Sequence, residues 1–117
     1  MFDDVSSVAL RTALSGLALR QRVIADNISN IETPGYRAGR VQFEEALRSA
    51  VDSGVSADAV TPSIGKSAEP TRENGNNVNL DHETLANVDT NLRYQLTLRA
   101  LDSKYGLLRD AIKGGGA

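Results

Sequence analysis

The chain has 117 residues, no cysteine and a formal net charge of −2. This near-neutral charge provides no electrostatic attraction to nucleic acid or to an anionic membrane surface, and the lack of cysteine excludes disulfides and thiolate metal sites. Aromatic residues make up only 4% of the sequence, so a core must be built mainly from aliphatic side chains.

The N-terminal segment does not look like a secretory signal. It carries acidic residues where a signal needs basic ones, and Arg11 and Arg20 interrupt its apolar residues. We therefore expect it to belong to the mature protein. No window approaches the roughly 20 consecutive apolar residues that span a bilayer, so we do not expect an integral membrane protein.

Heptad-spaced apolar residues predict a long helix over residues 5–32. Its seam consists of Leu10, Leu14, Leu17, Ile24, Ile28 and Ile31. Gln21 holds the one polar place in this stripe, where it either sets the register of a helix pair or reaches the edge of the seam. The helix must end before Thr33, because a residue that precedes proline is disfavoured in the α region.

Residues 33–40 are predicted to form a turn. Thr33 to Tyr36 places Pro34 second and Gly35 third, as a type II turn prefers. Polar residues of modest helix propensity precede this turn: Asp26, Asn27, Ser29 and Asn30. We expect their side chains either to bond neighbouring groups and the backbone of the turn or to be solvated.

The middle of the chain is expected to hold one short helix and a flexible linker. Over residues 41–52, Phe43, Leu47 and Val51 fall on one side of a helix. Residues 53–79 contain clusters of glycine, proline and asparagine without sustained periodicity, which predicts mobile or extended chain.

A second long helix is predicted over residues 80–112, followed by a tail over residues 113–117. Its later turns carry an apolar stripe formed by Tyr94, Leu98, Leu101, Tyr105, Leu108 and Ile112. Its earlier turns carry a second stripe, offset around the helix, formed by Leu85, Val88, Leu92 and Leu96.

These elements predict an all-α fold in a single domain, residues 1–117, whose long helices pack as a coiled-coil-like hairpin. We expect both seams, together with Leu92, to form an assembly interface. A two-helix hairpin has one internal interface, so the apolar residues outside it would face water: Val8, Ala13, Ala18, Val23 and the stripe from Leu85 to Leu96. Either the short helix near Phe43 covers them or, as we favour, other copies or other proteins do.

The residues offer little for catalysis, and no catalytic, cofactor or metal site is predicted. His82 is the only histidine, and its acidic neighbours Asp81 and Glu83 point in other directions on a helix. We expect a solvated histidine at a helix start. Gly16 lies inside a helix rather than at a nucleophile elbow, so close approach of another helix is its expected use.

The segment ADNISNIETPGYRA, residues 25–38, resembles the signature of the flagellar rod and hook axial proteins. The motif residues are Asn27, Asn30, Thr33, Pro34, Gly35 and Tyr36. Further segments, FEEAL, NGNNVNLDHE and NLRYQLTLRALDSKYGLLRDAIKG, look like the proximal rod subunits of that family in order and spacing. NLRYQ and LRDAI favour this subtype over the other short rod protein, FlgC.

The resemblance implies a structural protein without catalysis or cofactor. Such a protein is exported through the flagellar type III apparatus without a cleaved signal and polymerises in the periplasmic rod of the basal body. Its terminal helices would pack in the inner tube, transmit torque and line the export channel. The implied partners are copies of itself, rod proteins of the FlgC and FlgF type, the adaptor FliE, the MS ring and the export gate. Two alternatives stay open: a rod protein of the FlgC type, and a helical adaptor or secretion chaperone.

Overall fold

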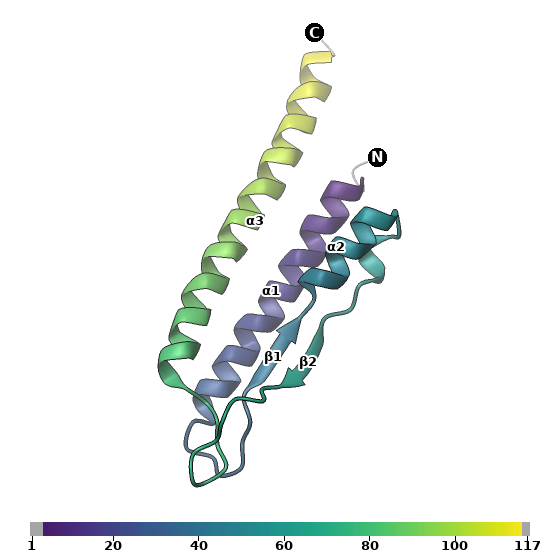
Figure 1. Ribbon diagram of the computed structural model, residues 1–117. Coiled ribbons are helices and arrows are strands. Elements are labelled where there is room, and N and C mark those ends of the chain that lie inside the picture. The colour runs from purple at the N-terminus through teal and green to yellow at the C-terminus, as the bar shows by residue number, and fades with distance from the viewer. Residues whose placement is uncertain (1–3, 116–117) are drawn as a thin grey trace.

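Two long helices run antiparallel along the molecule, which measures 69 × 27 × 14 Å. The computed structural model describes residues 4–115, apart from the side chain of Leu108. Helix α1 (Val5–Ser29) lies beside α3 (Leu80–Gly115), and α3 continues past the start of α1 (Figure 1). The helix therefore includes the first part of the expected tail, whereas residues 116–117 lie outside the described residues.

Side chains define both ends of α1. At its start, the Asp4 carboxylate accepts a hydrogen bond of 2.8 Å from the Ser7 amide, as an N-cap does. The helix ends at Ser29, three residues before the predicted end. The Asn30 side chain donates to the Asp26 carbonyl at 2.8 Å, and the Thr33 hydroxyl donates to the Asn30 side chain at 3.0 Å. These local bonds replace a further helical turn.

The predicted Pro-Gly turn is present. Gly35 has a φ of +75°, and the Tyr36 amide donates to the Thr33 carbonyl at 3.2 Å. Both features fit a type II turn, in which the third residue needs a positive φ.

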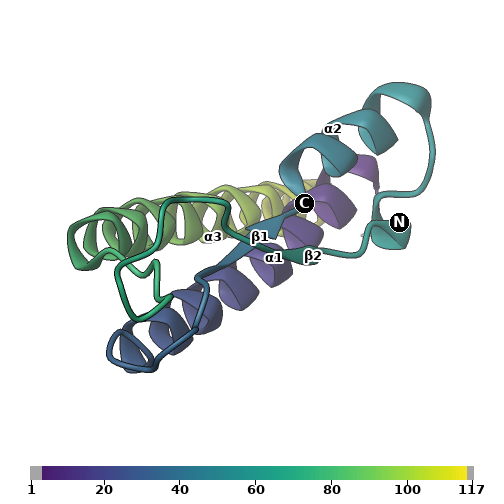
Figure 2. The same cartoon turned by 60° about the horizontal axis from the view of Figure 1, so that its bottom comes forward.

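The all-α prediction is wrong in one respect, because the chain forms a small antiparallel sheet. Strand β1 (Gly39–Gln42) pairs with β2 (Ser63–Lys66), and Gly39 lies opposite Lys66. The sheet lies against α1, with β1 the nearer strand to the helix (Figure 2). Strands of this length carry too few residues to show an alternating pattern that a sequence could reveal.

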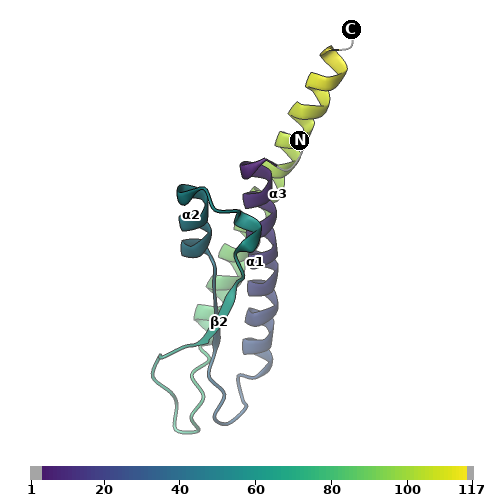
Figure 3. The ribbon, with the colours of Figure 1, turned by 90° about the vertical axis from the view of Figure 1, so that its right-hand side faces the viewer.

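Helix α2 (Glu44–Ser53) follows β1 directly. It begins later than the predicted 41–52, because β1 uses the first residues of that range. Gly54 ends the helix in the left-handed region, with a φ of +76°. Helix α2 lies beside the first half of α1. It runs in the same direction as α3 and opposite to α1 (Figure 3).

The expected flexible linker over residues 53–79 is folded in the structure. It contains a short 3-10 helix, η1 (Ala57–Ala59), where the Ala57 carbonyl accepts a bond of 3.3 Å from the Thr12 hydroxyl of α1. It also contains β2 and a loop that folds back beneath α1 (Figure 1). Side-chain hydrogen bonds rather than an apolar period order this segment, so a search for periodicity could not find it.

The hydrophobic core lies between α1 and the β1–α2 junction. It consists of Leu17, Val23, Val41 and Phe43, all at least nine-tenths buried. Ala13 and Tyr94 pack against it. Of the α1 residues expected outside the helix seam, Val23 is thus buried within the chain, as the alternative expectation had it, whereas Ala13 is only half-buried.

Gly16 makes the core possible, because a β-carbon there would lie 2.5 Å from the Phe43 ring. The close approach is therefore made by this ring rather than by another helix. We expect Gly16→Ala to lower the free energy of unfolding by about 1–3 kcal/mol, although alanine gains up to about 1 kcal/mol in helix propensity. Urea unfolding followed by circular dichroism measures the change.

Gly106→Ala is the matched control. A β-carbon there meets nothing nearer than the Arg109 guanidinium at 3.9 Å, so only the gain in helix propensity remains. We expect this variant to be slightly stabilised. An equal gain from Gly16→Ala would show that the Phe43 ring does not lie over Gly16.

Candidate assembly interface

Asn27, the first motif asparagine, is fully buried and satisfies all of its side-chain bonding capacity inside the chain. Its oxygen accepts from the Gly39 amide at 2.8 Å and from the Tyr36 hydroxyl at 3.3 Å. Its amide nitrogen donates to the Gly39 carbonyl and to Glu83, each at 3.1 Å. The residue therefore joins α1, β1 and α3.

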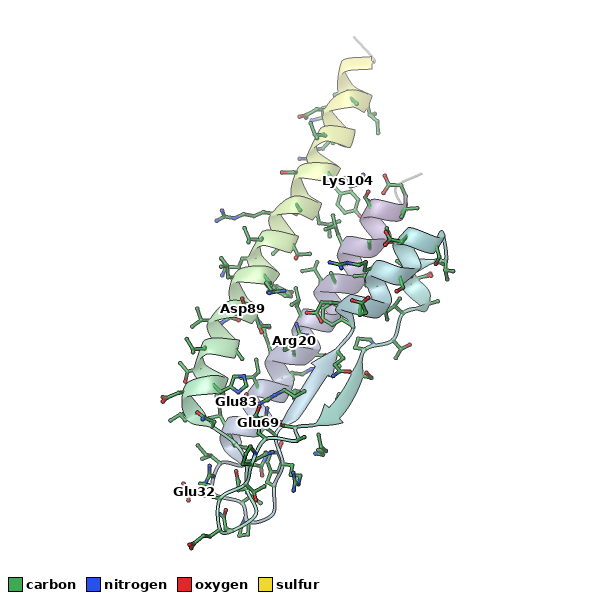
Figure 4. The ribbon with its side chains drawn as sticks, viewed as in Figure 1. Arg20, Glu32, Glu69, Glu83, Asp89 and Lys104 are labelled. Carbon is green, nitrogen blue, oxygen red and sulfur yellow. The ribbon has the colours of Figure 1, made fainter. Side chains whose placement is uncertain are left out.

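Glu83 carries a fully buried carboxylate on the first turn of α3 and lies between that helix and the β1 side of the molecule (Figure 4). The Arg40 guanidinium of β1 donates to it at 2.8 Å, and Asn27 donates to its other oxygen. A buried carboxylate needs such partners, because an unpaired one would be strongly disfavoured. At this level α1 and α3 are thus joined by a polar contact, whereas the predicted hairpin packed the two helices through apolar seams.

Asn76 fixes the returning loop to the motif turn. Its amide nitrogen donates to the carbonyls of Asn30 and Thr33, each at 2.8 Å. Its oxygen accepts from the Val78 amide at 2.8 Å and from Arg72 at 2.9 Å. Like Asn27, it is fully buried.

Asn77 and Arg72 complete this set of contacts. Asn77 accepts from the Ala38 amide at 2.7 Å and donates to the Ser67 carbonyl at 3.1 Å. Arg72 donates to the Ile31 carbonyl at 2.6 Å. We call the set the amide cluster: Asn27, Arg40, Arg72, Asn76, Asn77 and Glu83.

The amide cluster explains two of the four polar residues before the Pro-Gly turn, Asn27 and Asn30, whereas Asp26 and Ser29 are exposed. The Asn27 side chain bonds Gly39 of β1 and Glu83 of α3, and the Asn30 carbonyl accepts from Asn76 of the loop, so both residues find partners within their own chain. The sequence contained one signal, since NGNNVN repeats asparagine where a loop must satisfy backbone groups. The Pro-Gly turn itself is exposed at three motif residues: Thr33, Pro34 and Gly35.

His82 lies at the start of α3, as expected. Its amide donates to the Asn79 side chain at 3.1 Å, and its Nδ1 lies 3.5 Å from the Arg40 guanidinium. Within residues 4–115 no group of three His, Cys, Asp or Glu side chains is placed to hold a metal ion. Nor is any helix of that range long and apolar enough to cross a bilayer.

The structure separates the predicted seam residues into three groups. Leu17, Ile24 and Leu101 are buried within the chain. Half-buried positions are Leu10, Leu14, Ile28, Ile31 and Tyr105. Exposed positions are Leu92, Leu98 and Ile112, while the side chain of Leu108 lies outside the described part.

The two helices therefore do not share one continuous apolar seam. Several of their contacts are polar: Gln21 donates to Asn91, and Arg11 donates to the Tyr105 hydroxyl at 2.8 Å. Gln21 thus faces the partner helix, which fits a role in setting the register. On α3, Thr90 is only 1% exposed, so a polar residue occupies the face toward α1.

The first turns of α3 instead expose an apolar stripe to solvent. Leu85, Val88, Leu92 and Leu96 have exposed fractions of 71%, 61%, 57% and 56%. Their spacing of three and four residues places them in one row on the helix. We call this row the α3 ridge. It confirms the expectation that this stripe lies outside the intramolecular contact.

A groove opens on another face, between the first half of α1, α2 and α3. It has a volume of about 610 Å³. Its lining is largely apolar and includes Val5, Ala9, Leu10, Ala13, Leu17, Phe43, Leu47, Val51 and Thr97. We call it the α1–α2 groove.

Arg20 contacts two residues that line the α1–α2 groove, Glu44 and Phe43. It donates to both carboxylate oxygens of Glu44, at 2.6 and 2.7 Å, and to the Val41 carbonyl at 2.8 Å. The hydrogen bonds from Arg20 to Glu44 hold the pKa of this carboxyl below its ordinary value. The guanidinium also lies 5.1 Å from the centre of the Phe43 ring. The ring is thereby held against Gly16.

An ion pair joins the start of α1 to α3, where Lys104 lies 2.8 Å from Asp4 (Figure 4). The hydrogen bond from Lys104, helped by the Ser7 amide, lowers the pKa of Asp4 from 3.8 to about 2. Because the pKa is lower in the folded state, the contribution of Asp4 to stability is present above the unfolded pKa. It is lost as the pH falls through the folded one.

We therefore expect the carboxyl carbon of Asp4 to titrate near pH 2 in an NMR experiment. Lys104→Met should return this pKa most of the way toward its ordinary value, because the largest cause is removed. A normal Asp4 pKa in the unsubstituted protein would contradict the contact.

Comparison with known proteins finds a family model and several relatives that all belong to flagellar rod proteins. A family model described as "Flagella basal body rod protein" matches residues 9–37. Flagellar basal body rod protein FlgB of Escherichia coli is 30% identical over 135 aligned residues, which cover 96% of this chain and 98% of that protein. FlgB of Bacillus subtilis is 29% identical over 119 residues, covering 91% and 92%. FlgB of Borreliella burgdorferi is 32% identical over 107 residues, covering 71% and 77%. The family model spans most of α1 and the Pro-Gly turn, and the relatives extend the match along most of the chain.

Proposed function

Because the chain belongs to the FlgB family of flagellar basal body rod proteins and is thus a structural subunit of the rod, we propose that it assembles with further subunits through its long helices. The observation that carries this proposal is the α3 ridge. Four apolar side chains in one row, each more than half exposed, contribute little to packing within the monomer. Contiguous exposed apolar surface of this kind is typical of protein interaction sites.

We also propose how the subunit is exported, where it resides and which proteins it contacts. The subunit is exported through the flagellar type III apparatus without a cleaved signal, reaches the periplasmic rod, transmits torque and lines the export channel. Its partners are its own copies, rod proteins of the FlgC and FlgF type, the adaptor FliE, the MS ring and the export gate. It carries no catalysis. These points are supported by membership of a family of structural rod proteins.

A helical adaptor or secretion chaperone would use the same amphipathic helices to bind one partner. The placement of the apolar surfaces favours the rod subunit over this alternative. The α3 ridge and the α1–α2 groove lie on different faces, so contacts between them repeat from copy to copy, whereas an adaptor dimer would use one shared patch.

Sedimentation velocity over a wide range of protein concentration tests the proposal. We expect a monomer in dilute solution that grows into open-ended assemblies as concentration rises, with filaments visible by electron microscopy. A stable dimer that persists on dilution and does not grow would support the adaptor and contradict self-assembly.

A further inference from the structure

We propose that the α3 ridge of one copy docks into the α1–α2 groove of the next copy, with both copies pointing the same way along the rod. This inference rests on the proposed self-assembly and names the surfaces that perform it. A convex apolar row and a concave apolar groove are both uncovered in the monomer. Because they lie on one chain but on different faces, each copy can use both at once.

The lengths of the two surfaces match. The α3 ridge runs from Leu85 to Leu96, which corresponds to about 16 Å of helix. The α1 wall of the groove runs from Val5 to Leu17, or about 18 Å. Leucine and valine side chains of the ridge would meet the small residues Ala9 and Ala13, which leave room in the floor.

The charges beside the two surfaces favour one direction of docking. On α3, Asp89 precedes Arg93 by one turn, and their side chains are 2.9 Å apart. On the α2 wall, Arg48 precedes Asp52 by one turn. If the incoming α3 runs parallel to α2, each charge meets one of opposite sign. Such exposed pairs add little affinity, but like charges in the reverse direction would oppose docking.

This direction gives all copies the same polarity. Within one copy, α2 and α3 already run the same way and α1 runs opposite (Figure 3). An incoming α3 parallel to α2 is therefore also parallel to the resident α3. Two copies related in this way form a head-to-tail contact rather than a two-fold dimer.

The same alignment predicts an axial offset between copies. Antiparallel docking on α1 places the incoming Leu85 beside Leu17 and Leu96 beside Val5. Within one copy, Gln21 faces Asn91 of the resident α3. The incoming α3 is thus displaced along α1 by about ten residues, on the order of 15 Å. A contact with an axial offset leads to an open helical array rather than a closed ring.

Cysteine cross-linking tests the docking, because the chain contains no native cysteine. We would make Leu92→Cys on the ridge and Ala9→Cys in the groove as separate full-length proteins with distinguishable tags. The two are mixed under assembling conditions and oxidised. We expect a disulfide-linked pair that contains one chain of each kind. A single chain that carries both substitutions should give a ladder of linked oligomers.

Leu107→Cys serves as the matched control for Leu92→Cys. Leu107 also lies on α3 and is 71% exposed, but it is outside the ridge. We expect the mixture of Leu92→Cys with Ala9→Cys to cross-link several-fold more than the mixture of Leu107→Cys with Ala9→Cys. Equal yields in assembled samples would overturn the docking.

The outcomes separate this inference from the proposed function. If the unsubstituted protein assembles but Leu92→Cys links only to itself, the ridge packs on a second ridge and the docking is wrong. If Leu92→Cys links instead to a different rod protein in isolated basal bodies, the occupant is not a second copy. If the unsubstituted protein never assembles at any concentration, self-assembly fails and the docking fails with it.

Discussion

Asn27→Leu is expected to lower the free energy of unfolding of the monomer by about 3 kcal/mol or more. Leucine has a similar shape but cannot bond the Gly39 amide or the buried Glu83 carboxylate, which would both lose a partner. Leaving a buried polar group unpaired costs more than an average hydrogen bond contributes. Urea unfolding followed by circular dichroism measures the effect.

Asn87→Leu is the control for this substitution, because Asn87 is an exposed amide on α3. We expect its effect to stay within about 0.5 kcal/mol. If Asn27→Leu were equally mild, the Asn27 bonds would not be what holds β1 and α3 to the end of α1. A selective loss of protection from hydrogen exchange at Gly39 in Asn27→Leu would add direct support.

Leu92→Asp is expected to abolish assembly while leaving the monomer folded. Leu92 is 57% exposed and contributes little to the monomer, so its free energy of unfolding should change by no more than about 0.5 kcal/mol. In an interface, the same carboxylate would be buried without a partner. Sedimentation velocity and swimming of a complemented strain measure assembly, and circular dichroism measures the fold.

Leu101→Asp is the contrasting variant on the same helix. Leu101 is only 8% exposed, so an aspartate there would place a charge against α1 and destabilise the monomer by several kcal/mol. Leu92 and Leu101 thus look alike in the sequence, but Leu92→Asp should block assembly whereas Leu101→Asp should destabilise the monomer. Normal rods and normal swimming with Leu92→Asp would contradict the role given to the α3 ridge.

The long helices could be predicted because their signals are local and repeat many times. Apolar spacing identified α1 and α3, and Pro34 with Gly35 identified the turn that follows α1. A pattern of apolar residues shows that a face must be covered, but it does not show what covers it. The stripe from Leu85 to Leu96 was therefore found correctly, and its exposure fits the cover by other subunits that the sequence analysis favoured, although the pattern itself does not identify the residues of the partner.

The amide cluster could not be predicted, because its contacts join residues far apart in the sequence. Asn27 meets Glu83 and Asn76 meets Asn30, each pair across more than forty positions. No periodicity marks such bonds, and asparagine is common in solvated loops. The loop therefore looked flexible, and the face of α3 that carries Glu83 and Thr90 did not look like a packing face.

The most direct test of the central claim, that the α3 ridge is kept for another subunit, is thiol labelling of Leu92→Cys. The reaction rate with a maleimide would be measured on dilute monomer and on assembled rods. Because Leu92 is exposed in the monomer, we expect rapid labelling there and strong protection after assembly. Equally rapid labelling in the two states would contradict the claim.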